Sequence, residues 1–228
     1  MKMRIDIISA VPKILESPLN TSIVKRAQDK NLVQIVIHDL RDYAFDKHKQ
    51  IDDKPFGGGP GMLLKPEPFF LCIEKLQSQR KYDHIIFTVP GGEVYNQKLA
   101  NKFSIAENIM IVTGHYKGID DRVRETFATD EISIGNFILS GGELLSLIIT
   151  DSIVRLIPGV LGDSESALKD SFMDEEIIEA PFYTRPAVYR NKKVPEILLS
   201  GNDKKIEEWK ENQSKILTKN WKNKNRLE

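Results

Sequence analysis

The segment of residues 133–157 constrains the fold of this chain more than any other. It begins with Ser-Ile-Gly-Asn-Phe-Ile-Leu-Ser-Gly-Gly-Glu and continues as a largely apolar run, residues 144–157. Paired glycines such as Gly141 and Gly142 permit backbone angles and close approaches that side chains forbid. The segment therefore predicts a buried loop that turns at glycines and leads directly into a buried helix. Taken alone, it is typical of a strand-to-helix turn without a ligand.

Length, charge and cysteine content narrow the class of protein. The 228 residues are enough for one medium domain and a smaller one. Because 33 Lys and Arg residues balance 33 Asp and Glu residues, a nucleic-acid site requires local clustering of basic side chains. A single Cys excludes an internal disulfide, and no segment has the apolar length of a signal peptide or a membrane span. These features predict a cytoplasmic protein that does not contact a membrane.

Hydrophobic periodicity predicts alternating strands and helices along residues 1–161. Strands are expected at residues 5–8, 32–37, 85–89 and 109–113, and helices at residues 21–31, 66–77, 97–103 and 144–157. The third strand is expected to stop at Pro90 and the fourth at Gly114. This alternation is typical of an α/β fold with a mostly parallel sheet, in which ligands usually lie beyond the carboxyl ends of the strands.

The composition changes after Pro158 and Gly159. Residues 162–176 combine Gly, Ser and acidic residues without apolar periodicity, and a polar helix is expected from about Asp203 onward. The sequence therefore predicts an α/β domain at residues 1–161, a flexible linker at residues 162–175 and a small helical C-terminal domain at residues 176–228.

Several common catalytic and binding motifs are missing from the sequence. The glycine-rich residues 56–62 lack the Lys-Ser/Thr pair of a P-loop, and no Rossmann fingerprint or Gly-x-Ser-x-Gly motif occurs. The four histidines do not have metal-ligand spacing, and one Cys cannot build a zinc site. Cys72 lies in an apolar helical pattern and is expected to be a core residue. Kinase, hydrolase, metalloenzyme and redox functions are therefore not supported, and no metal ligands are predicted.

Three glycine-bearing loops follow predicted strands and are expected to meet at one edge of the sheet. They are residues 90–92, residues 114–116 and residues 134–142. Loops of this kind build a slot lined by main-chain groups, which suits a flat base with its ribose. Ile134, Phe137 and Leu139 are expected to flank the rings of such a ligand.

The motifs of the chain resemble those of the bacterial tRNA (guanine-N1)-methyltransferases of the SPOUT class. The resemblance spans nearly the whole sequence in the family's order, and the motifs together are very specific although each alone is weak. The matching segments are residues 51–62, 118–120, 133–135, 139–143, 157–162, 170–172, 183–186 and 198–202.

The resemblance implies a fold and a cofactor site that periodicity alone does not predict. The family ties the C-terminal part of its α/β domain into a deep trefoil knot that binds S-adenosylmethionine. It works as a homodimer whose active sites are shared between the chains, and it methylates N1 of guanine 37 of tRNA, just 3′ of the anticodon. The residues that the resemblance places at the cofactor are Pro90, Gly114, Tyr116, Ile134, Gly135, Asn136, Phe137, Ile138, Leu139, Gly141 and Gly142.

By the same resemblance Asp170 is the general base and Arg155 its partner at the substrate. These residue types fit the chemistry, because guanine N1 becomes nucleophilic only as its proton leaves, and a carboxylate can take that proton. An arginine can stabilise the negative charge that develops on O6. The alternative for Asp170 is a solvated linker acid, and for Arg155 a lone charge at the end of an apolar helix.

The chain departs from the family at a few positions. Lys117 stands where most relatives have Glu, Phe137 replaces a common Tyr, and Asp203 replaces a usual His. The C-terminal domain is also shorter than in several relatives. Since the replaced Glu is linked to metal handling in the family, a role for Mg²⁺ as a second cofactor stays open.

Two basic runs lie in the predicted C-terminal domain and are candidates for binding tRNA phosphates. They are Arg185, Arg190, Lys192 and Lys193, and then Lys215, Lys219, Lys222, Lys224 and Arg226. Such runs are more often a solvated helix face. Two other functions are also open, namely a non-catalytic RNA-binding module and another knotted RNA methyltransferase that acts at a different RNA position.

Overall fold

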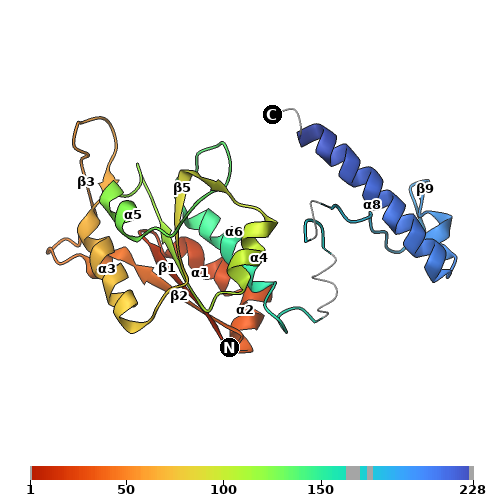
Figure 1. Cartoon of the computed structure of the whole chain (residues 1–228), viewed down its shortest axis with the longest axis horizontal. Coiled ribbons are helices and arrows are strands. Elements are labelled where there is room, and N and C mark those ends of the chain that lie inside the picture. Colours follow the sequence, from red (N-terminus) through yellow and green to blue (C-terminus); the bar gives the residue numbers. More distant parts are fainter. Residues whose placement is uncertain (1, 163–169, 174–176, 226–228) are drawn as a thin grey trace. The chain divides into compact units, whose positions relative to one another are not determined.

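The computed structural model describes residues 2–162, 170–173 and 177–225 of the chain (Figure 1). The chain divides into two compact units, Met1–Gly162 (unit 1) and Asp163–Glu228 (unit 2). Most of the predicted linker, residues 162–175, lies outside the described residues, so its flexibility stays a prediction.

Unit 1 is built on a five-stranded, fully parallel sheet with the strand order β2-β1-β6-β5-β7. This confirms the predicted α/β fold class. A separate pair of short strands, β3 and β4, is antiparallel. The elements of unit 1 are β1 (Met3–Ser9), α1 (Lys13–Leu19), α2 (Ser22–Asp29), β2 (Val33–Asp39), η1 (Leu40–Tyr43), β3 (Asp52–Asp53), β4 (Leu63–Leu64), α3 (Pro66–Gln79), β5 (His84–Val94), α4 (Gln97–Ser104), β6 (Asn108–Thr113), α5 (Asp121–Phe127), β7 (Asp130–Ser133) and α6 (Glu143–Val154).

Helices cover both faces of the sheet, and side chains that alternate along the strands fill two separate cores. In β6, Ile109 and Ile111 pack toward α1, α2, α4 and α6, whereas Met110 and Val112 pack toward α3 and α5. Figure 1 shows α4 and α6 on the side of the sheet opposite α3 and α5. Burial on both faces explains why the strands are apolar almost throughout, as is usual for parallel sheets. Cys72 is fully buried in the second core, as predicted.

The largest error of the sequence prediction within the sheet concerns the end of β5. This strand does not stop at Pro90, because it continues to Val94 with a register shift between Thr88 and Glu93 against β7. Gly92 permits this path, since a Cβ atom there would lie 2.5 Å from the backbone of Glu131. The loop predicted to follow the strand is therefore a bulge within it.

Two short helices were not anticipated from the sequence. The helix α1 contains Pro18 and follows β1 directly, and α5 begins at a capping aspartate, Asp120, whose carboxylate accepts a hydrogen bond from the backbone N–H of Arg122. Both are about two turns long, so their apolar periodicity is too brief to separate them from loops.

Unit 2 consists of short elements and one long helix. The strands β8 (Val188–Tyr189) and β9 (Lys192–Lys193) form a hairpin whose turn residues, Arg190 and Asn191, have φ values of 47° and 62°. The 3₁₀-helix η2 (Glu196–Leu199) and the helix α8 (Asp203–Asn225) follow. The predicted polar helix from Asp203 onward is thus confirmed.

Candidate functional site

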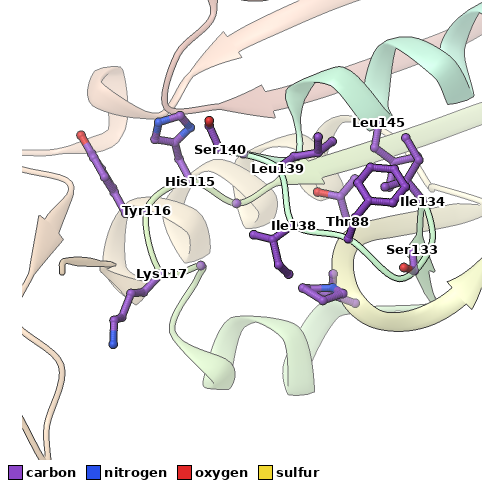
Figure 2. A pocket seen from close by; sticks show the side chains of 17 residues that line it. Thr88, His115, Tyr116, Lys117, Ser133, Ile134, Ile138, Leu139, Ser140 and Leu145 are labelled. Carbon is purple, nitrogen blue, oxygen red and sulfur yellow. The ribbon is translucent and has the colours of Figure 1, made fainter. Parts of the chain in front are cut away.

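The carboxyl ends of three neighbouring strands converge on one pocket in unit 1. β6, β5 and β7 lie side by side, and the pocket is lined by the bulge of β5, the loop after β6 and the loop between β7 and α6. Its volume is about 330 Å³, at the lower end of the range of small-molecule sites. Figure 2 shows the loop with His115, Tyr116 and Lys117 facing the loop with Ile138 and Leu139 across this pocket.

Close packing at two glycines joins the loops that form the pocket. The backbone N–H of Gly142 donates a 2.7 Å hydrogen bond to the carbonyl oxygen of Gly114, and Gly141 forms a β-bridge with His115. A Cβ atom at Gly142 would lie 1.9 Å from Oγ1 of Thr88. The close approach expected at this glycine pair is therefore present.

The prediction that Gly141 and Gly142 adopt backbone angles forbidden to other residues is wrong. Gly142 has an ordinary φ of −80°, and Gly141 is not among the glycines with positive φ. Space, rather than conformation, excludes a side chain at both positions. Positive φ values in this region belong instead to Gly118, Gly135 and Tyr116, and the 58° of Tyr116 is uncommon for a bulky residue.

Nine of the eleven residues predicted for the cofactor line this single pocket. They are Pro90, Gly114, Tyr116, Ile134, Phe137, Ile138, Leu139, Gly141 and Gly142. Gly135 and Asn136 are not among the residues that line this pocket, and their contact with the cofactor stays a prediction. Gly135 shapes the loop instead, because its φ is +130° and its N–H lies 3.2 Å from the Ser133 hydroxyl.

Several lining residues were not predicted as site residues. They are Thr88, Val89, His115, Lys117, Gly118, Ser133, Ser140 and Leu145. Most are direct sequence neighbours of predicted residues, so extending each loop by one or two positions finds them. The sequence distinguishes Lys117 only as a departure from the family pattern. Its side chain packs against the glycine-rich residues 56–62, since a Cβ at Gly61 would lie 3.1 Å from its Cγ, and in Figure 2 its amino group points away from the apolar side chains of the pocket.

Comparison with known proteins identifies the family. The model of the tRNA (guanine-1)-methyltransferase TrmD family matches residues 3–227. The chain belongs to this family. A protein named tRNA (guanine-N(1)-)-methyltransferase from Azobacteroides pseudotrichonymphae is 57% identical over 217 residues, which cover 95% of this chain and 97% of that protein.

Further relatives carry the same name. The protein from Christiangramia forsetii is 56% identical over 95% of this chain and 96% of its own length, and the protein from Bacteroides fragilis is 55% identical over 93% and 94%. These matches confirm the resemblance inferred from the motifs. The pocket coincides with the loops on which the resemblance to the TrmD family places the cofactor.

The two residues that the resemblance to the TrmD family predicts to be catalytic belong to different units. Arg155 follows the last residue of α6 in unit 1 and is half-buried. Asp170 belongs to unit 2, where it lines a cavity of about 600 Å³ together with Glu179, Tyr183 and Trp209. Burial raises the pKa of Glu179, and the charge of Asp170 raises it further. That Arg155 and Asp170 meet at one guanine stays a prediction.

Within residues 2–162, 170–173 and 177–225, no group of three His, Cys, Asp or Glu side chains is arranged to hold a metal ion. Over the same described residues, no helix combines the length and the apolar character needed to cross a membrane.

Proposed function

We propose that this protein transfers the methyl group of S-adenosylmethionine to N1 of guanine 37 in tRNA. The observation that carries the proposal is the pocket at the carboxyl ends of β5, β6 and β7, lined by the glycine-bearing loops on which the TrmD resemblance places the cofactor. Family membership supports the substrate, and so do relatives named tRNA (guanine-N(1)-)-methyltransferase that match over 94–97% of their own lengths. The single Cys fits the cytoplasm, where we expect the enzyme to act on tRNA.

The lining of the pocket fits S-adenosylmethionine. Ile134, Ile138 and Leu139 offer apolar contacts for the rings of the nucleoside, while Gly114 and Gly141 bring main-chain groups close to a ligand. When bound, S-adenosylmethionine supplies a methyl group that its positive sulfur already activates. The residues of the pocket then have mainly to hold and orient it, and such positioning contributes much of the rate in a displacement reaction. The trefoil knot of the family is part of this proposal.

The proposed roles of Asp170 and Arg155 follow from the chemistry of guanine. Asp170 accepts the N1 proton, so that the nitrogen lone pair becomes available to the methyl group. Arg155 donates hydrogen bonds to O6, on which negative charge develops as the proton leaves. Arg155 lies at the end of α6, the helix that begins at the glycine pair of the pocket.

A homodimer with shared active sites is the assembly that we propose. In this arrangement residues 1–161 bind the cofactor, residues 162–175 form the linker that carries Asp170, and residues 176–228 bind tRNA. Support comes from unit 2, where apolar side chains such as Phe182, Tyr189 and Leu199 are exposed. Large exposed apolar groups are typical of surfaces that bind a partner.

A methylation assay tests the proposal. The protein is incubated with labelled S-adenosylmethionine and unmodified tRNA that carries guanine just 3′ of the anticodon, and the product nucleoside is identified and mapped. A matched tRNA with adenine at that position is the control. We expect 1-methylguanosine at position 37 in the first tRNA and no label in the second. Label at another position would instead support a different knotted RNA methyltransferase, and tRNA binding without any transfer would support a non-catalytic RNA-binding module.

A further inference from the structure

A buried acidic side chain lies directly behind the pocket and has no role in the proposed reaction. Glu143 is the first residue of α6 and is only 1% exposed. Acidic side chains are rarely fully buried unless they are paired. Its position immediately after Gly142, which lines the pocket, places a carboxylate at the pocket end of α6.

The contacts of Glu143 hold it between three elements. Its Oε1 accepts a 2.8 Å hydrogen bond from the hydroxyl of Ser9 at the end of β1, and the hydroxyl of Thr113 at the end of β6 lies 3.3 Å away. Its Oε2 lies 3.5 Å from Nδ1 of His115. This Nδ1 is buried and has no hydrogen-bond partner among the described residues, so the carboxylate is the group that faces it.

The carboxylate lies beside the backbone of Gly141, a residue that lines the pocket. A Cβ atom at Gly141 would lie 2.3 Å from Oε2 of Glu143 and 2.4 Å from Nδ1 of His115. The acidic group therefore fills the space that a side chain at Gly141 would occupy, and this explains why glycine is required there. Gly141 itself lines the pocket.

The lining of the pocket otherwise lacks negative charge. Within the described part of the chain, no Asp or Glu is among the lining residues, whereas Lys117 is. The amino end of α6 also points to the pocket, and a helix carries partial positive charge at this end. A ligand with a positive sulfur would meet an unfavourable potential here without a compensating acid, and Glu143 in the first turn of α6 supplies one.

We propose that the charge of Glu143 makes the pocket prefer the sulfonium form of the cofactor to the neutral thioether that remains after methyl transfer. This inference rests on the proposed function. S-adenosylmethionine and S-adenosylhomocysteine differ by one methyl group and by the positive charge on sulfur. A fixed negative charge behind Gly141 therefore favours the methyl donor and promotes release of the demethylated product.

The size of the effect follows from Coulomb's law. At an effective dielectric constant of about 20, two unit charges several ångströms apart interact strongly enough to change an affinity by roughly tenfold or more. The change Glu143→Gln removes the charge, retains the shape and still allows the amide oxygen to accept the hydrogen bond from Ser9. We expect it to weaken binding of S-adenosylmethionine about tenfold and to change binding of S-adenosylhomocysteine less than about twofold.

Calorimetric titration of both ligands into the full-length protein is the test. Glu74→Gln is the matched control, because it makes the same chemical change on an exposed position of α3, outside the pocket. Ser9→Ala removes the hydrogen bond but keeps the charge of Glu143, so it should change both affinities by the same factor. If Glu143→Gln does not fold, Glu143→Asp takes its place; it keeps the charge and should keep the preference for S-adenosylmethionine.

The outcomes separate this inference from the proposed function. Equal weakening of both ligands in Glu143→Gln, or no change in either, contradicts the electrostatic role. If only Glu143→Asp folds, loss of the ligand preference in that variant contradicts it. A wild-type protein that binds neither ligand instead contradicts the proposed function itself.

Discussion

Unit 1 and unit 2 differ in what they do with their apolar side chains. Every buried side chain of the described residues lies in unit 1, between Met3 and Val160. Unit 2 buries none of its described residues fully, and Phe182 is 78% and Tyr189 61% exposed. A sheet covered on both faces makes its own core, whereas a hairpin and one long helix do not enclose one.

This difference indicates a division of labour. The pocket in unit 1 consists of loops fixed by buried strands, so it exists before a ligand binds. Unit 2 carries Asp170, exposed apolar side chains and both basic runs, features that take effect only when a partner is present. Changes in unit 1 should therefore affect cofactor binding and stability, and changes in unit 2 should affect methyl transfer and tRNA binding.

The largest effect is expected for Asp170→Asn. This change keeps the size of the side chain and its ability to form hydrogen bonds, but it cannot accept the N1 proton. Methyl transfer should decrease about a hundredfold to ten-thousandfold, the usual contribution of a general base. Affinity for S-adenosylmethionine, measured by calorimetry, should stay at the wild-type value because the pocket belongs to unit 1.

The exposed Glu196→Gln serves as the control for this variant, since it removes an acid from unit 2 without touching the proposed base. A fully active Asp170→Asn protein would mean that another group removes the proton.

Reversing the charge of three basic residues on α8 should weaken tRNA binding by unit 2 and leave cofactor binding by unit 1 unchanged. Lys215, Lys219 and Lys222 line one cavity beside this helix. Each phosphate contact contributes about 0.9 to the slope of log affinity against log salt. Changing all three to Glu should weaken tRNA binding and reduce this slope, measured by filter binding at several salt concentrations. Binding of S-adenosylmethionine should not change. Unaltered tRNA affinity would place the RNA surface elsewhere.

Acid should destabilise unit 1 through Asp6. Burial alone would raise the pKa of this fully buried carboxyl, but hydrogen bonds from His38, Arg4 and Tyr82 outweigh burial and lower the pKa from 3.8 to about 2. Because the folded pKa is the lower one, the stabilisation is present above about pH 4 and is lost as the pH falls toward 2. It amounts to about 2 kcal/mol.

Hydrogen exchange of the β1 amides between about pH 5 and about pH 2.5 measures this loss, and Asp6→Asn should show a smaller pH dependence than wild type. Both tryptophans, Trp209 and Trp221, lie in unit 2, so their fluorescence should not report the effect of this mutation. The same pH dependence in both proteins would remove Asp6 from the explanation.

The smallest effect concerns the metal. Lys117 places a cation beside the pocket where the family resemblance predicts an acid, and a cation can itself offset charge that develops on guanine. We propose that Mg²⁺ is therefore less important in this protein, so that a chelator changes wild-type activity only a few-fold. Lys117→Glu should increase the dependence on Mg²⁺ when both proteins are titrated with chelator. Equal dependence would show that Lys117 does not substitute for the metal.

Sequence alone predicts much of unit 1 because its signals are local. Short apolar runs identify β1 and β6, and the motif at residues 133–145 locates the loop that lines the pocket. The bulge at Pro90 was missed because a proline followed by glycines usually ends a strand, whereas here Gly92 lets the chain continue against β7.

Glu143 shows a different limit of prediction from sequence. It belongs to the motif at residues 139–143, but its burial depends on Ser9 and Thr113, which are 134 and 30 residues away in the sequence. The angles of Gly141 and Gly142 were mistaken for the same reason, because the atoms that exclude a side chain there come from distant segments. Sequence patterns identify such residues, but only the fold shows what surrounds them.

A mixed dimer tests the division between the units most directly. One chain carries Asp170→Asn, and the other carries Ile138→Arg, which puts a bulky cation on a pocket residue that is 78% exposed and therefore not needed for folding. Each homodimer should be inactive. If the pocket of one chain works with Asp170 of the other, the mixed dimer keeps one intact site and about half of the wild-type rate of methyl transfer to tRNA. A mixed dimer as inactive as the two homodimers would contradict the shared site.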